Sequence, residues 1–196
     1  MKRILVLLYC VTMVLFVHAQ HIRKDRLEDD GRHQIVTSVK SISFNRDEYR
    51  FSMKIYESKK KVSWCLVMSS FCPIYFATKL HLVLGNDLNM TLPCNNVSVT
   101  KADKHKYIST GNTTYVSQLI PTDYYSSLYR MNPAELDMID DYGIKAIRIE
   151  TDSFHKAKEF KKNQLGKFLS KSRKKIQKRL DNPLSERDLL SNKSNY

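Results

Sequence analysis

The chain has 196 residues with only 5 glycines and 5 prolines, which fits one domain with an ordinary core and excludes a low-complexity or linker-dominated protein. Its formal net charge of +13 is unevenly spread: residues 20–144 carry 16 basic and 14 acidic side chains, whereas residues 145–196 carry 15 basic and 6 acidic ones. This basic C-terminal quarter indicates either an anionic partner or a solvated outer face.

The N-terminus has the layout of a secretory signal peptide. Lys2 and Arg3 precede the apolar stretch Ile4–Val17, and Val17-His18-Ala19 places small residues before a cleavage point. The apolar stretch is shorter than the roughly 20 residues that a membrane-spanning helix needs. Residues 1–19 are therefore predicted to be removed, leaving an exported protein that is soluble in the periplasm or outside the cell.

Domain boundaries follow from changes in patterning. Residues 20–35 are polar and of mixed charge, and we expect a flexible arm there. Residues 36–180 are expected to form a single α+β domain, and residues 181–196 a disordered polar tail.

Alternation of apolar and polar residues predicts most of the strands. It is clearest over Glu48–Glu57, where Tyr49 and every second residue to Ile55 would share a buried face. Gly85-Asn86 predicts a two-residue hairpin turn. Further strands are predicted over Ser38–Arg46, Val62–Met68, Lys79–Leu84, Asp87–Leu92, Asn96–Thr100, Tyr115–Ile120, Ile144–Glu150 and Phe154–Phe160.

Two helices are predicted late in the chain. Asn132-Pro133-Ala134-Glu135 matches a capping box with proline at the first helical position, and Gly143 would end this short helix in the left-handed conformation. Apolar residues from Leu165 to Leu180 recur at three- and four-residue spacing, which predicts an amphipathic helix over about 163–180. The fold class expected is thus α+β: an antiparallel sheet of about six to eight strands, a short capped helix, and a long C-terminal helix packed on one face.

This order of elements resembles that of small uncharacterised exported proteins of Bacteroidota-type bacteria. The hairpin strand Thr78–Leu84 with Leu92, and the strand Gly143–Ile149 after the short helix, carry the likeness. The resemblance implies a periplasmic or surface protein with a sheet and a packed helix, and it implies no activity.

The cysteines leave two readings open. Cys65, Cys72 and Cys94 remain after signal cleavage, and either two of them form a disulfide or all three are small buried hydrophobes. A zinc site with His81 does not fit the tighter ligand spacing of structural zinc. No catalytic residue, metal ligand or cofactor is assigned. Asn89, Asn96, Asn112 and Asn192 begin N-x-[ST] triplets, which are glycan acceptors in a eukaryotic secretory pathway.

The basic C-terminal helix is the strongest functional feature. Its anion-contacting candidates flank the apolar stripe and are Lys167, Lys171, Lys174, Lys175 and Lys178. They form either a solvated face or a contact surface for an anionic polymer, a membrane surface or another exported protein. Nucleic acid is the least favoured partner, because no aromatic side chains interleave with the charges. We expect a non-enzymatic exported binding or accessory protein, the alternative being an exported hydrolase whose active site has no recognised motif.

Overall fold

The structure is a computed structural model that describes residues 21–58, 61–72, 77–109, 115–152, 154–185 and 188. The predicted signal peptide and most of the predicted tail lie outside these residues. The described part forms ten strands and two helices in the order β1 (Ile22–Leu27), β2 (His33–Thr37), β3 (Lys40–Phe44), β4 (Asp47–Ser58), β5 (Lys61–Ser70), β6 (Ala77–Leu84), β7 (Asn89–Ser109), β8 (Tyr115–Met131), α2 (Pro133–Tyr142), β9 (Ile144–Thr151), β10 (His155–Glu159) and α3 (Gln164–Asp181).

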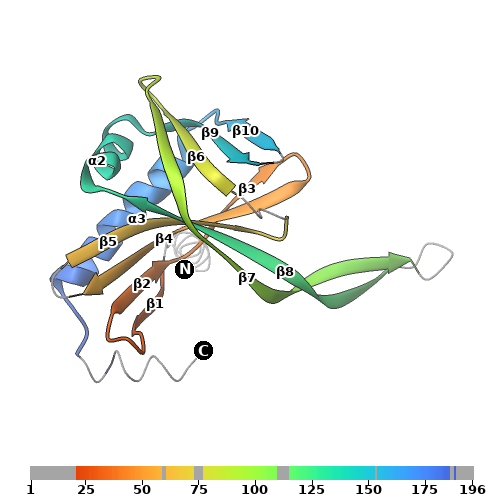
Figure 1. The fold of residues 1–196 in the computed structure, drawn as a ribbon, viewed down its shortest axis with the longest axis horizontal. Coiled ribbons are helices and arrows are strands. Elements are labelled where there is room, and N and C mark those ends of the chain that lie inside the picture. The colour runs from red at the N-terminus through yellow and green to blue at the C-terminus, as the bar shows by residue number, and fades with distance from the viewer. Residues whose placement is uncertain are drawn as a thin grey trace, which may run out of the picture.

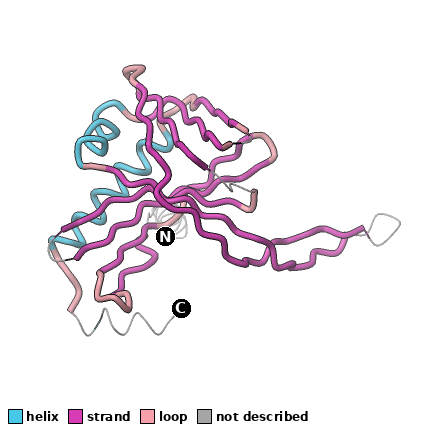
Figure 2. Tube along the Cα trace, viewed as in Figure 1, coloured by secondary structure: helices cyan, strands magenta, loops and turns pink. Residues whose placement is uncertain are grey.

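Strands dominate the molecule (Figure 2). Nine strands pair in the order β1-β2-β4-β5-β8-β7-β6-β9-β10, every pairing is antiparallel, and β3 pairs with β4. The expected α+β class with six to eight strands is therefore wrong: the described chain is mostly one antiparallel sheet of ten strands, with a 10-residue and an 18-residue helix. The two helices do begin and end within one residue of their predicted positions.

The segment expected to be a flexible polar arm is part of the sheet. β1 and β2 pair with each other, and β2 also pairs with β4 from His33↔Glu57 to Val36↔Lys54. Ile35 is fully buried there. The polar composition misled the prediction because Asp25 and His33 are buried as partners of each other, as described below, rather than solvated.

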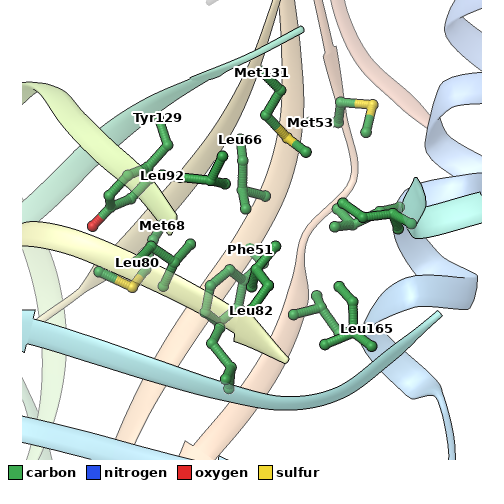
Figure 3. Close-up of a cluster of buried hydrophobic side chains, with 14 of the residues drawn as sticks. Phe51, Met53, Leu66, Met68, Leu80, Leu82, Leu92, Tyr129, Met131 and Leu165 are labelled. Atoms are coloured by element: carbon green, nitrogen blue, oxygen red, sulfur yellow. The ribbon is translucent and has the colours of Figure 1, made fainter. Parts of the chain in front are cut away.

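The sheet curls so that its β10 end approaches β3, which pairs with β4 outside the main strand order. β10 comes to lie beside β3 (Figure 1), where Lys156 forms an ion pair with Asp47 and Lys158 Nζ donates to Ser43 O. The concave face holds one hydrophobic cluster (Figure 3), to which β4 contributes Tyr49, Phe51, Met53 and Ile55 as their alternation predicts. Helix α3 contacts β2, β4 and β9 on this side and completes the core.

The hairpin between β6 and β7 is one residue longer than predicted. Asp87 N–H donates to Leu84 O at 3.0 Å, and Leu84 N–H donates to Leu88 O at 2.9 Å. Asp87 takes a positive φ of 64°. This is the three-residue loop in which a residue in the left-handed conformation follows a type I turn.

β7 and β8 extend far beyond the rest of the sheet (Figure 1). β6 pairs with β7 only as far as Lys79↔Pro93, and β5 pairs with β8 only as far as Ser70↔Tyr125. Beyond these points the two strands pair only with each other, to Ser109↔Tyr115. We call residues 100–109 and 115–124 the hairpin arm.

The capping box of α2 is confirmed. Glu135 N–H donates to Asn132 Oδ1 at 2.9 Å, and Asn132 N–H donates to Glu135 Oε2 at 2.7 Å. The helix ends at Gly143, but with φ 68° and ψ −173°, which is not the predicted left-handed helical conformation.

Candidate functional site

Helix α3 is held tightly against the start of β9. Leu165, Leu169 and Ile176 are essentially fully buried, so the predicted apolar stripe faces the core. Asn163 precedes the helix, and its Oδ1 accepts from Ile144 N–H at 2.9 Å instead of capping α3. Gly166 allows this approach, because a Cβ there would lie 2.2 Å from Asn163 Oδ1 and 2.8 Å from Ile144 N.

The side of α3 away from the core carries the predicted lysines. Lys167, Lys171, Lys174 and Lys178 are exposed, whereas Lys175 is half-buried. The four exposed residues follow one another at spacings of four, three and four, which places them on one side of the helix in a row of about 16 Å. We call these four residues the basic row. None of them forms an ion pair with the described residues.

Two carboxylates of helix α2 form ion pairs with α3, but with Arg173 and not with the basic row. Asp137 Oδ1 lies 2.7 Å and Asp140 Oδ2 2.8 Å from Arg173 Nη1. These carboxylates therefore tie α2 to α3. Both carboxylates thus pair with Arg173, and neither forms an ion pair with the basic row.

The C-terminal end of α3 borders a cavity of about 500 Å³. It lies between the helix and the beginning of β1, and its lining residues are His21, Ile22, Lys175, Lys178, Arg179 and Asn182. The basic surface therefore continues from Lys178 into a hollow that contains no carboxylate among its lining residues.

Beneath this cavity lies a buried chain of charged groups. His33 Nε2 lies 2.6 Å from Asp25 Oδ1, and His33 Nδ1 lies 3.1 Å from Glu57 Oε2. Arg179 Nε donates to the other oxygen of Asp25. The Asp25 hydrogen bond, helped by Glu57 and opposed by burial, raises the pKa of His33. Burial works to raise the pKa of Asp25, but hydrogen bonds from His33 and Arg179 outweigh it and lower that pKa.

No sequence motif connects these groups: Asp25 and His33 lie on neighbouring strands, but Glu57 and Arg179 come from distant parts of the chain. Period-two alternation through Asp25 and His33 would have placed both on the face shared with Ile35, but only if residues 20–35 had been recognised as strands. The network links β1, β2 and β4 to α3. Its role is therefore to hold these four elements together.

A second cavity, of about 370 Å³, lies at the base of the hairpin arm. Its lining carries charges of both signs, several of them already paired: Arg50 Nε lies 2.9 Å from Glu48 Oε1, and Asp47 pairs with Lys156. Cys72 also contributes to the wall. The mixed charge does not favour one class of ligand.

One arrangement resembles hydrolytic machinery. Thr91 Oγ1 lies 2.9 Å from His81 Nδ1, and His81 Nε2 lies 2.8 Å from Glu150 Oε2, which gives a hydroxyl–imidazole–carboxylate chain across β7, β6 and β9. Lys79 and Arg148 also lie near Glu150, at 3.5 and 3.7 Å. None of Thr91, His81 and Glu150 lines either of the two cavities described above. Among the described residues, the cross-strand chain therefore lies outside both of these cavities.

The cysteines are free thiols, with Cys65 buried and Cys72 and Cys94 partly buried. Within the described residues, no group of three or more His, Cys, Asp or Glu side chains is arranged to hold a metal ion. Of the four N-x-[ST] asparagines, Asn89 and Asn96 are exposed, and Asn112 and Asn192 lie outside the described residues.

Neither described helix is both long and apolar enough to cross a lipid bilayer. No protein-family model, curated protein or solved structure matches the chain. The functional argument therefore depends on the charge, burial and geometry of the surfaces described above.

Proposed function

We propose that this chain is a non-enzymatic exported binding protein that holds an anionic polymer along the basic row of α3. The observation that carries the proposal is the row itself: four exposed lysines on one side of a docked helix, without an ion-pair partner among the described residues. Repeated charges on an extended polymer can meet such a row one after another, and each contact releases counterions.

The burial of the opposite side of α3 favours a polymer over a membrane. A helix that lies in a membrane interface inserts its apolar face into the lipid. In this protein Leu165, Leu169 and Ile176 already pack in the core. The helix can therefore offer only its charges, which act through electrostatic attraction alone.

The test is binding of the mature chain, beginning near Gln20, to immobilised dextran sulfate. We expect retention that weakens steeply with salt, and we expect elution at clearly lower salt for the variant Lys167→Gln/Lys171→Gln/Lys174→Gln/Lys178→Gln. Glutamine keeps the hydrophilic stem and removes the charge, so the fold should be preserved.

The matched control removes the same charge elsewhere. Lys79→Gln/Lys145→Gln/Lys161→Gln/Lys162→Gln changes four exposed lysines outside α3, so it should elute close to the wild type. If both variants elute at equally lowered salt, only net charge matters, and the basic row is not the binding site. If the chain binds vesicles that contain phosphatidylserine but does not bind dextran sulfate, the partner is a membrane surface and not a polymer.

Export is a separate part of the proposal with its own test. N-terminal sequencing of the secreted product should begin at or near Gln20. Recovery of a stable form that begins at Met1 would contradict it.

A further inference from the structure

The face of the sheet turned away from α3 has a hollow of about 550 Å³ around Cys65. Three of its lining residues are cations, Arg32, Lys61 and Arg130, and none is a carboxylate. Cavities of this size hold small organic molecules. We call it the outer-face pocket.

Sheet register adds a further cation next to this pocket, on the strand beside Cys65. Lys54 of β4 pairs directly with Cys65 of β5, which pairs directly with Arg130 of β8. Directly opposite residues share a face of the sheet, so Cys65 lies between two cations. Burial raises the pKa of the Cys65 thiol, while the charges of Arg130 and Lys54 oppose that rise.

The cations have few competing partners. Arg130 and Lys61 form no ion pair with the described residues. Arg32 pairs with Asp30 at 2.5 Å, but about half of each side chain is exposed, and such surface pairs are weak. A ligand anion can therefore recruit all three positive charges without breaking a buried ion pair.

The aromatic ring of Tyr56 contacts two cations, Arg32 in the pocket lining and Lys54 beside it. The Arg32 guanidinium lies 5.0 Å and the Lys54 ammonium 4.4 Å from the centroid of the Tyr56 ring. Cation–π contacts at these distances are attractive. Tyr56 thus holds both charges beside the pocket before any ligand arrives, which lowers the cost of ordering them on binding.

Neutral donors complete the lining. The register of β7 against β8 shifts between Cys94 and Asn96, which leaves Asn95 as an extra residue. The backbone N–H of Arg130 donates to Asn95 Oδ1 at 2.6 Å. That bond leaves the Nδ2 group of Asn95 as a donor, beside Asn96 and the Ser63 hydroxyl in the pocket wall. β-Bulges commonly re-aim side chains at binding sites in this way.

We propose that the outer-face pocket binds a small anion that carries two or more carboxylate, sulfate or phosphate groups. Three cations without a lining carboxylate demand more than one negative charge, and the amides and hydroxyl supply hydrogen bonds to the anion's oxygens. This site lies on the opposite face of the sheet from the basic row. It would therefore bind a small ligand independently of the polymer.

The experiment measures binding of three probes to the mature chain by calorimetry in low-salt buffer: citrate, pyrophosphate and a multiply sulfated disaccharide. They distinguish carboxylate, phosphate and sulfate chemistry. We expect at least one probe to bind with 1:1 stoichiometry and to shift the Arg130 side-chain Nε–H resonance. Arg130→Gln/Lys61→Gln should weaken that binding at least tenfold.

Lys161→Gln/Lys162→Gln removes the same charge from an exposed loop and should bind like the wild type, as should the four-lysine variant of the basic row. If the double pocket variant does not fold, Lys61→Gln alone replaces it, because this exposed side chain has no ion-pair partner among the described residues. Absence of binding by all three probes, or equal weakening by Lys161→Gln/Lys162→Gln, would overturn the proposal. Failure of the polymer to bind α3 would leave the proposal for the outer-face pocket unaffected.

Discussion

At the scale of single residues, Gly143 controls how α2 passes into β9. Its φ of 68° and ψ of −173° belong to a region that is essentially restricted to glycine. Space is also lacking, because a Cβ at this position would lie 2.0 Å from Asn163 Nδ2. Since Asn163 Oδ1 accepts from Ile144 N–H, a side chain at residue 143 would disturb the start of β9 as well.

We therefore expect Gly143→Ala to lower the free energy of unfolding by more than 2 kcal/mol, combining about 1–3 kcal/mol of backbone strain with displacement of Asn163. Gly31→Ala is the matched control: Gly31 also has a positive φ, of 75°, but a Cβ there would meet no atom within 4 Å. It should cost about 1–2 kcal/mol. Urea unfolding measures both, and equal costs would mean that the contact with Asn163 is unimportant.

The Asp25–His33–Glu57 chain makes stability depend on pH in two directions. His33 has a raised pKa, so its stabilisation is fully present below the usual histidine value of 6.5 and is lost as pH rises through the folded-state pKa. Asp25 has a lowered pKa, so its stabilisation is present above the usual value of 3.8 and is lost as pH falls through the folded-state pKa. These two groups together are most stabilising between those two values.

We expect the wild type to lose stability as pH rises above 6.5, and His33→Gln to lose much less over the same rise. Glutamine retains a hydrogen bond donor but cannot titrate. Urea midpoints at several pH values measure the effect, with His155→Gln as a control because His155 is exposed on β10. An unchanged pH dependence in His33→Gln would show that His33 does not titrate with folding.

At the scale of elements, α3 combines two sides with different roles. Leu169→Ala should destabilise the whole domain by about 2–5 kcal/mol, because it leaves a cavity in the shared core. Lys171→Ala/Lys174→Ala should stay within about 0.5 kcal/mol of the wild type, as exposed substitutions do. Thermal melts compare them, and a silent Leu169→Ala would mean that α3 does not contribute to the core.

The hairpin arm should contribute little to the stability of the body. Leu119 on the arm is 54% exposed, and an isolated two-stranded ribbon is only marginally stable. Replacing residues 106–118 with Asn-Gly keeps every pairing of β5 with β8 and of β6 with β7. We expect the free energy of unfolding to change by less than about 1 kcal/mol, and a larger loss in urea unfolding would show that the arm supports the body.

Elements of this protein were predictable where local patterning decides structure. The alternation in β4 and the capping box of α2 are both short-range signals, and the structure confirms both. β1 and β2 were missed because they bury the charged residues Asp25 and His33, which pair with each other across the two strands and with Glu57 and Arg179 from elsewhere in the chain. The full length of β7 and β8 was missed because none of the arm residues whose burial is described, 100–105 and 117–124, is buried, so burial imposes no alternation there.

At the scale of the whole molecule, the order of the strands could not be predicted from the sequence. β5 lies beside β8, and β6 lies beside β9, so the central pairings join segments that are more than 50 residues apart. The two candidate binding surfaces also differ in whether the sequence alone could predict them. The lysines of α3 are visible as a periodic pattern, whereas Arg32, Lys61 and Arg130 come together only through the sheet.

The topology also decides how the cysteines can pair. Cys65 and Cys94 lie on β5 and β7 with β8 between them, so they are about two strand spacings, or roughly 9–10 Å, apart. Cys72 follows the end of β5, where Ser70 is level with Tyr125, whereas Cys94 is level with Tyr129, about 13 Å further along β8. Disulfides need Cα atoms within about 7 Å.

We therefore expect Cys65, Cys72 and Cys94 to remain free thiols. Iodoacetamide labelling in denaturant without reductant, read by mass spectrometry, should add three labels, and a reduced control should give the same number. In the native protein Cys65 should react last, because it is buried and burial raises its pKa, which keeps the thiolate form scarce. A single label in the unreduced sample would require a disulfide, and two of the three strand segments would then have to be repositioned to form it.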